Sequence, residues 1–185
     1  MLIIAGAVTL THIFPADLET TMMFYDGLDR LAEYLPHIEI VDVQGPGQFR
    51  MVYSATEMGG YHIRIYTDVK SELRLSERQL MIMPTQEYKP VPQRATFNSS
   101  VGQGYYASES LFWPEAGNRT RVEFRLELRA RLPRPKGLRF MPAAAVKSIV
   151  DNMTERRVNE IANGFISNSL AAFPTWKQSR NSHAF

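Results

Sequence analysis

Residues 119–132 alternate almost perfectly between charged and apolar side chains, and this pattern constrains the fold more than any other. The odd positions from Arg119 to Arg131 are all charged, and the even positions from Val122 to Leu132 are all apolar. Successive side chains of a β-strand point to opposite faces, so the segment predicts a strand with one apolar and one ionic face. Such a strand is typical of an antiparallel sheet that is covered on one side and solvated on the other.

The rest of the chain predicts further strands, two short helices near its start and one long helix near its end. Helical spacing of apolar residues between Asp17 and Leu35 predicts two helices that meet near Gly27 and end at Pro36. A final helix is predicted over residues 142–173, ended by Pro174. The further strands are predicted over residues 8–14, 37–43, 49–55, 61–70, 79–84 and 95–113, with a loop over 87–92.

The predicted C-terminal helix carries two apolar stripes that point in different directions. Val146, Val150 and their neighbours share one face, whereas Val158, Phe165 and their neighbours share a face that is rotated away from the first, at about 100° per residue. The rotation falls at residues 154–157. Either the helix bends there, or its second half packs on a different element.

Composition favours one globular domain and excludes several functions. The 185 residues suit a single domain over residues 1–176, followed by a flexible polar tail over 177–185. The net charge of +2 gives no global field for nucleic acid, and the absence of cysteine excludes disulfides and thiolate chemistry. The apolar opening at residues 2–8 follows no basic region, and no run of about 18 apolar residues occurs, so a cytoplasmic protein is predicted.

The order of elements and two local motifs resemble a known superfamily. Residues 14–17 (FPAD) resemble the entry into the first helix of the helix-grip (SRPBCC) superfamily, which includes START domains and the birch-pollen allergen. Residues 31–38 (LAEYLPHI) resemble the exit from its second helix. The resemblance implies an α+β fold, in which a curved antiparallel sheet of about seven strands grips a long C-terminal helix. Residues 132–142 and 173–176 also resemble an uncharacterised cyanobacterial and plastid branch.

The superfamily resemblance implies an apolar cavity between the sheet and the last helix. Its lining is predicted from the apolar faces of the strands and helix. The predicted ligand-binding residues are His12, Met51, Tyr53, Ile63, Ile65, Val122, Phe124, Leu126, Val146, Ile149, Val150 and Met153. The alternative is that these residues fill an ordinary core, because ligand pockets and cores have similar apolar compositions.

Motifs that carry chemistry are weak in this chain. Residues 102–107 (GQGYYA) match a loose pattern for dinucleotide binding, but no helix is predicted after them. The preferred interpretation is therefore a strand that is weakened by glycine. The four histidines are scattered, and no metal site or cofactor is predicted. His12 falls on an apolar face and is interpreted as an interior histidine. Glu57 and Asp68 are interpreted as solvated charges.

Residues 119–139 form a basic segment, with eight Lys and Arg residues against two Glu. One interpretation is an ordinary solvated strand face with cross-strand partners such as Asp68 or Glu72. The other is a docking face for an acidic protein or an anionic membrane surface. The predicted partner-binding residues are Arg121, Arg125, Arg129 and Arg131.

Three functions remain open from the sequence. The first is non-catalytic binding of an apolar or amphipathic small molecule, such as a lipid, an isoprenoid or a pigment-like compound, beside photosynthetic membranes. The second is an assembly protein that docks through its basic strand. The third and weakest is a cyclase- or dehydratase-like enzyme using His12, Tyr53 and Tyr105, with no catalytic residues assigned.

Overall fold

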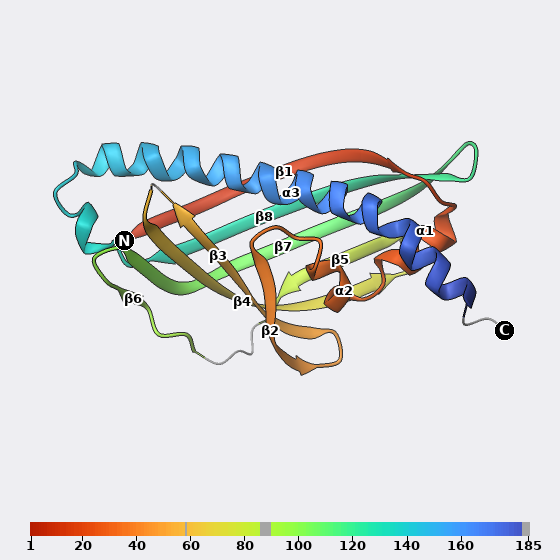
Figure 1. The fold of residues 1–185 in the computed structure, drawn as a ribbon, viewed down its shortest axis with the longest axis horizontal. Helices are drawn as coiled ribbons and strands as arrows, with labels where there is room; N and C mark the ends of the chain where they lie inside the picture. Colours follow the sequence, from red (N-terminus) through yellow and green to blue (C-terminus); the bar gives the residue numbers. More distant parts are fainter. Residues whose placement is uncertain (58, 86–89, 183–185) are drawn as a thin grey trace.

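One sheet and one long helix dominate the computed structural model, which describes residues 1–57, 59–85 and 90–182 (Figure 1). The elements are β1 (Leu2–Phe14), α1 (Leu18–Tyr25), α2 (Leu28–Ala32), β2 (Ile38–Gly45), β3 (Gln48–Glu57), β4 (Tyr61–Arg74), β5 (Gln79–Pro84), β6 (Arg94–Ala95), β7 (Ser99–Glu115), β8 (Arg119–Leu132), a 3-10 helix (Lys136–Leu138) and α3 (Ala143–Ser182). The strand order is β1-β8-β7-β5-β4-β3-β2, with β6 on β7. The predicted α+β class, with two short helices after the first strand, is confirmed.

Residues 119–132 form strand β8, as their alternating pattern predicted. It pairs with β1 from Leu2↔Leu132 to Phe14↔Thr120, and with β7 on its other side. Val122, Phe124 and Leu126 are buried on the face that α3 covers. The apolar side chains therefore build the core, while the charged side chains of the same strand lie on the outer face.

The two short helices are separated by a glycine, as predicted. Asp17 caps α1, because its carboxylate accepts a hydrogen bond from the backbone N–H of Thr20 at 2.9 Å. Gly27 has φ of 109°, a left-handed conformation that only glycine adopts readily, and α2 begins directly after it.

The sheet contains one parallel pairing, between the first halves of β4 and β7. Strand β5 lies antiparallel between these two strands but ends at Pro84. Beyond that point β4 and β7 pair directly, from His62↔Ser99 to Tyr66↔Gln103. Gly104 permits the close approach, since a Cβ there would lie 2.4 Å from Cγ2 of Ile65. The GQGYYA segment thus lies within β7, which confirms its preferred interpretation as a strand.

Helix α3 runs beyond its predicted end. Pro174 lies inside the helix, which continues to Ser182, so the prediction that proline ends it is wrong. Phe173 and Trp176 flank the proline and pack against Phe24, with ring centroids 5.5 and 5.2 Å apart. These aromatic contacts offset the backbone hydrogen bond that proline cannot make. The rest of the predicted tail, residues 183–185, lies outside the described residues.

The two stripes of α3 pack on two different parts of the core. Val146 and Val150 join a cluster with Ile63, whereas Val158 and Phe165 join the larger cluster that contains the aromatic residues. The second of the two predicted alternatives is therefore confirmed. Within the described ranges, no helix combines the length and apolar character that crossing a membrane requires.

Gly164 lets α3 pass close to the turn before β2. A Cβ at this position would lie 2.4 Å from Cγ of Pro36, whose ring cannot rotate away. We expect Gly164→Ala to lower the free energy of unfolding by about 2 kcal/mol by overpacking, although alanine is the better helix former by about 1 kcal/mol. Urea unfolding measures this change. Ser167→Ala, at an exposed position of the same helix, is the control and should be neutral or slightly stabilising.

Candidate functional site

A small apolar cavity lies where the two core clusters meet beneath α3. Its volume is about 50 Å³, enough for one or two water molecules. The cavity forms where small side chains, Thr67 and Ala130 among them, leave the space between the clusters unfilled. Its lining comprises Ile4, Ile38, Tyr53, Ile63, Ile65, Thr67, Tyr105, Tyr106, Leu128, Arg129, Ala130, Met153, Thr154 and Arg157.

The structure brings four of the predicted lining residues to this cavity and places the others elsewhere. Those at the cavity are Tyr53, Ile63, Ile65 and Met153. Met51, Val122, Phe124 and Leu126 are buried in the larger cluster, and Val146 and Val150 in the smaller one. Ile149 lines a shallow surface depression with Asn152, and His12 contacts Tyr25 instead. Thr154 and Arg157, which the sequence analysis missed as lining residues, complete the wall on the α3 side.

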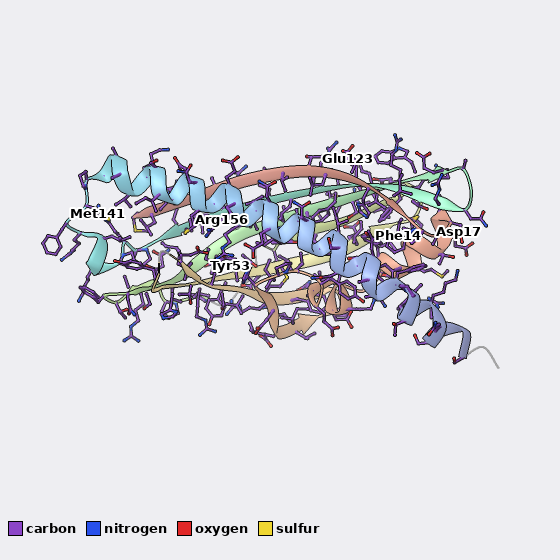
Figure 2. All side chains as sticks on the ribbon, turned by 45° about the horizontal axis from the view of Figure 1, so that its top comes forward. Phe14, Asp17, Tyr53, Glu123, Met141 and Arg156 are labelled. Atoms are coloured by element: carbon purple, nitrogen blue, oxygen red, sulfur yellow. The ribbon has the colours of Figure 1, made fainter. Side chains whose placement is uncertain are left out.

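Tyr53 connects the apolar cavity to a cluster of charged side chains. Its hydroxyl donates a hydrogen bond to Oε1 of Glu57 at 3.3 Å. Burial and the neighbouring Glu57 carboxylate raise the pKa of Tyr53, so its hydroxyl stays protonated. Figure 2 shows Tyr53 beneath α3, on which Arg156 is labelled.

Glu57 is the centre of that charged cluster and is only 1% exposed. Its Oε1 accepts a hydrogen bond from Nε of Arg157 at 2.6 Å, and its Oε2 accepts one from Arg156 at 3.2 Å. The interpretation of Glu57 as a solvated charge is wrong, because the long helix brings two guanidinium groups over the end of β3. The cluster ties β3 to α3 beside the cavity.

His37 and Glu160 extend the cluster towards solvent. Nε2 of His37 lies 2.8 Å from Oε1 of Glu160 and 3.2 Å from a terminal nitrogen of Arg157. The hydrogen bonds from His37 and from Arg157 lower the pKa of Glu160. The hydrogen bond to Glu57 raises the pKa of Arg157, so the guanidinium that lines the cavity stays charged. This network holds the turn before β2 against the middle of α3.

The remaining polar groups of the cavity are poorly suited to proton transfer. Burial raises the pKa of Tyr106 to about 12, and the hydroxyl of Thr154 donates to the backbone carbonyl of Val150 at 2.7 Å. An apolar cavity with a tyrosine hydroxyl and a guanidinium at one side suits a molecule that is mainly apolar and carries one polar group. Among the described residues, no group of three or more His, Asp or Glu could hold a metal ion.

His12 is partly buried and does not line the cavity. Its Nε2 is 3.2 Å from the hydroxyl of Tyr25, while its Nδ1 is buried without a hydrogen-bond partner among the described residues. Burial lowers the pKa of His12 to about 4, so the ring is neutral near pH 7. The three residues of the enzymatic hypothesis are therefore dispersed: Tyr53 lines the cavity, His12 does not, and the ring of Tyr105 stacks with the Arg129 guanidinium on the outer face of the sheet.

Asp68 is also buried, on the outer face of the sheet. Arg50 donates two hydrogen bonds to its carboxylate, both at 2.7 Å, and Gln44 donates a third at 3.0 Å. The interpretation of Asp68 as a solvated charge is wrong. Asp68 is also not a partner of the basic strand, because its carboxylate is bonded to Arg50 of β3 and Gln44 of β2.

The arginines of β8 pair with glutamates of β7 and of their own strand. Arg121 contacts Glu115 at 3.6 Å, and Arg125 contacts Glu109 at 3.2 Å. Arg125 and Arg129 also pair with Glu123 and Glu127, respectively. The general prediction of cross-strand partners is confirmed, but the partners named, Asp68 and Glu72, are wrong; Glu72 pairs with Arg74.

Comparisons with known proteins place this architecture in a fold class. No family model matches the sequence, and no curated protein matches it. Among solved structures, a Thermus thermophilus protein is 20% identical, with a TM-score of 0.52 over 90% of this chain and 99% of that one. The Zhui aromatase/cyclase from a Streptomyces species is 13% identical, with a TM-score of 0.53 over 95% of each chain. A START superfamily protein from Mycobacterium smegmatis is 14% identical, with a TM-score of 0.53 over 92% and 98%. The chain therefore has the helix-grip, START-like fold.

Proposed function

We propose that this protein binds an apolar or amphipathic small molecule, without covalent chemistry, in the cavity between the sheet and α3. The observation that carries the proposal is the composition of the cavity wall. Isoleucine, leucine, methionine and alanine make up seven of its fourteen residues, whereas Tyr53 and Arg157 supply polar groups at one side. Such a wall fits a molecule with a long apolar part and one polar end.

The proposal requires the cavity to enlarge when the ligand enters. Its volume of about 50 Å³ is far below the roughly 300–1,000 Å³ of typical ligand pockets. Met153 is the side chain best able to move, since it is unbranched and only partly buried. Tyr53 is also partly buried, and its displacement would open the cavity towards the Glu57 cluster.

A lipid, an isoprenoid or a pigment-like compound fits this chemistry. The resemblance of residues 132–142 and 173–176 to a cyanobacterial and plastid branch supports a cytoplasmic role at the periphery of photosynthetic membranes. A START superfamily protein and an aromatase/cyclase among the structural neighbours support an apolar ligand. The aromatase/cyclase keeps an enzymatic alternative open, but it has little support because His12 is not among the residues that line the cavity.

Filling the cavity tests the proposal. We expect Thr67→Leu to weaken binding of a fluorescent fatty acid at least tenfold, because its larger side chain occupies the space that the ligand needs. Thr9→Leu, at an exposed position of β1, is the matched control and should bind as the wild type does. Native mass spectrometry of protein made in its own host should show a co-purifying apolar mass. Equal affinity of both variants, or no bound mass and no probe binding, would contradict the proposal.

A second candidate function is docking on an acidic protein through Arg121, Arg125, Arg129 and Arg131. One observation favours it: Arg121 and Arg129 lie over the rings of Trp113 and Tyr105, at 4.9 and 5.3 Å, which holds both guanidinium groups extended on the outer face. Reversing the charge at Arg121 and Arg125, neither of which lines the cavity, should abolish capture of an acidic partner and leave fatty-acid binding unchanged.

A further inference from the structure

Exposed apolar side chains gather at the end of the molecule where β8 connects to α3. Phe140 is 94% exposed, and Phe97, Met1 and Ile3 are each at least 65% exposed. The hydrogen bond from the N–H of Gly137 to the carbonyl of Phe97 at 3.1 Å joins the two loops that carry the phenylalanines. Figure 2 labels Met141, the neighbour of Phe140, at this end of the molecule. Exposed phenylalanine at this level requires an explanation, because it is unfavourable in water.

The loop that presents Phe140 is held in place on both sides of it. The guanidinium of Arg134 donates to the carbonyl of Leu138 and, at 2.7 Å, to that of Met141. The N–H of Met141 donates to the carbonyl of Leu138 at 3.2 Å. The aromatic ring therefore projects from a hydrogen-bonded turn, and its exposure is a property of the fold.

The same end of the molecule is strongly basic. Residues 128–150 contain six Lys and Arg residues and no Asp or Glu, and two of the six, Arg129 and Lys147, pair with Glu127 and Asp151 just outside this range. Lys136 and Arg139 are exposed within the loop itself. The first turn of α3 carries no acidic residue, so the positive end of the helix dipole adds to this field. The six basic residues are Arg129, Arg131, Arg134, Lys136, Arg139 and Lys147.

A cleft opens beside the loop, between the start of β1 and the first turns of α3. Its volume is about 370 Å³, and apolar side chains such as Leu2 and Val146 line most of it. Arg134 and Lys147 lie in its wall, with Asp151, whose carboxylate pairs with Lys147 at 2.6 Å. An apolar depression next to cationic groups is suited to the acyl chain and phosphate of a single lipid.

We propose that this end of the molecule, formed by residues 133–142 together with Phe97 and the N-terminus, docks on an anionic phospholipid bilayer. Phe140 inserts at the boundary between headgroups and acyl chains, while Lys136 and Arg139 contact lipid phosphates. Such an interface favours a protruding aromatic side chain with basic residues around it. Burial of the ring and attraction of the basic side chains to the lipid phosphates both act at the depth of the headgroups. An acidic protein would match the charge but leave the projecting ring without an apolar environment. The surface is separate from the cavity, so the inference goes beyond the proposed function.

Sedimentation with vesicles of phosphatidylglycerol and phosphatidylcholine tests this proposal. We expect the wild type to bind mixed vesicles and not pure phosphatidylcholine, with affinity falling as salt rises. Phe140→Ser should weaken binding about tenfold, and Phe140→Trp should restore it. Lys136→Glu with Arg139→Glu should weaken it by at least about 25-fold, at roughly fivefold for each positive charge lost.

Matched variants test whether vesicle binding depends on this surface in particular. Leu75→Ser, at a residue that is 69% exposed elsewhere, and Lys70→Glu, on β4, should bind vesicles as the wild type does. Thr67→Leu should also keep full vesicle binding, so failure of the cavity proposal would leave this one intact. The proposal is overturned if anionic vesicles retain no protein, if soluble polyglutamate binds in their place, or if Phe140→Ser and Leu75→Ser behave alike.

Discussion

Replacing Glu57 with glutamine is expected to lower the free energy of unfolding by about 3 kcal/mol. Its carboxylate is 1% exposed and bonded to two guanidinium groups, of which that of Arg157 is itself only 18% exposed. Removing one partner of a buried ion pair leaves the other charge desolvated without compensation, which typically costs about 3–5 kcal/mol. Glu160 still contacts Arg157 in the variant, so the expected loss lies at the lower end of that range. Urea unfolding followed by circular dichroism measures the difference.

Three further variants show whether burial causes the loss. Arg156→Gln removes a guanidinium that is 66% exposed, and should cost less than about 1 kcal/mol. Arg157→Gln should cost nearly as much as Glu57→Gln, because it leaves the carboxylate buried. The double variant Glu57→Met with Arg157→Met should regain part of the stability, since two apolar groups need no partners. Equal losses for Glu57→Gln and Arg156→Gln would show that the pair contributes no more than a surface contact.

The strands of the sheet could be predicted because the alternation of buried and exposed side chains is a local property of the sequence. In β8, one alternating pattern determines which face is buried, and each of the fourteen residues from Arg119 to Leu132 lies in the predicted strand. The same pattern could have placed Glu57 correctly. Glu57 has the same parity as Met51 and Tyr53 in β3, so alternation places its carboxylate on the covered face, where it needs a buried partner.

Other features depend on contacts between distant segments and leave no local signal. Asp68 lies on the outer face, where alternation predicts solvent, and Arg50 and Gln44 bury it there. Pro174 normally ends a helix, but the packing of Phe173 and Trp176 around Phe24 carries α3 past it. The cavity also leaves no local signal, because it depends on how the side chains of the two clusters pack where the clusters meet. Most of the apolar residues predicted to line it fill those clusters instead.

The stability of the protein is expected to fall by about 2 kcal/mol between pH 6.5 and pH 4 because of His12 alone. Burial lowers the pKa of His12 from 6.5 to about 4 in the folded protein. Below pH 6.5 the unfolded chain binds a proton on His12 that the folded protein does not bind. The free energy of unfolding therefore falls as the pH is lowered, until the pKa of the folded protein is reached. A full shift would correspond to about 3 kcal/mol, and partial solvent access of the ring reduces it. The contribution is complete above pH 6.5 and lost below pH 4.

The pH dependence of one histidine is isolated by comparison with its own variant. Carboxylates such as Glu160, whose pKa is also lowered, contribute stability that the protein loses over part of the same pH range. The wild-type curve alone therefore does not isolate His12. The difference between wild type and His12→Gln, measured by urea unfolding at each pH, removes their contribution. That difference should change by about 2 kcal/mol between pH 7 and pH 4. Parallel curves for wild type and His12→Gln would mean that the folded protein accepts the proton as readily as the unfolded chain, and that the ring is not desolvated against Tyr25.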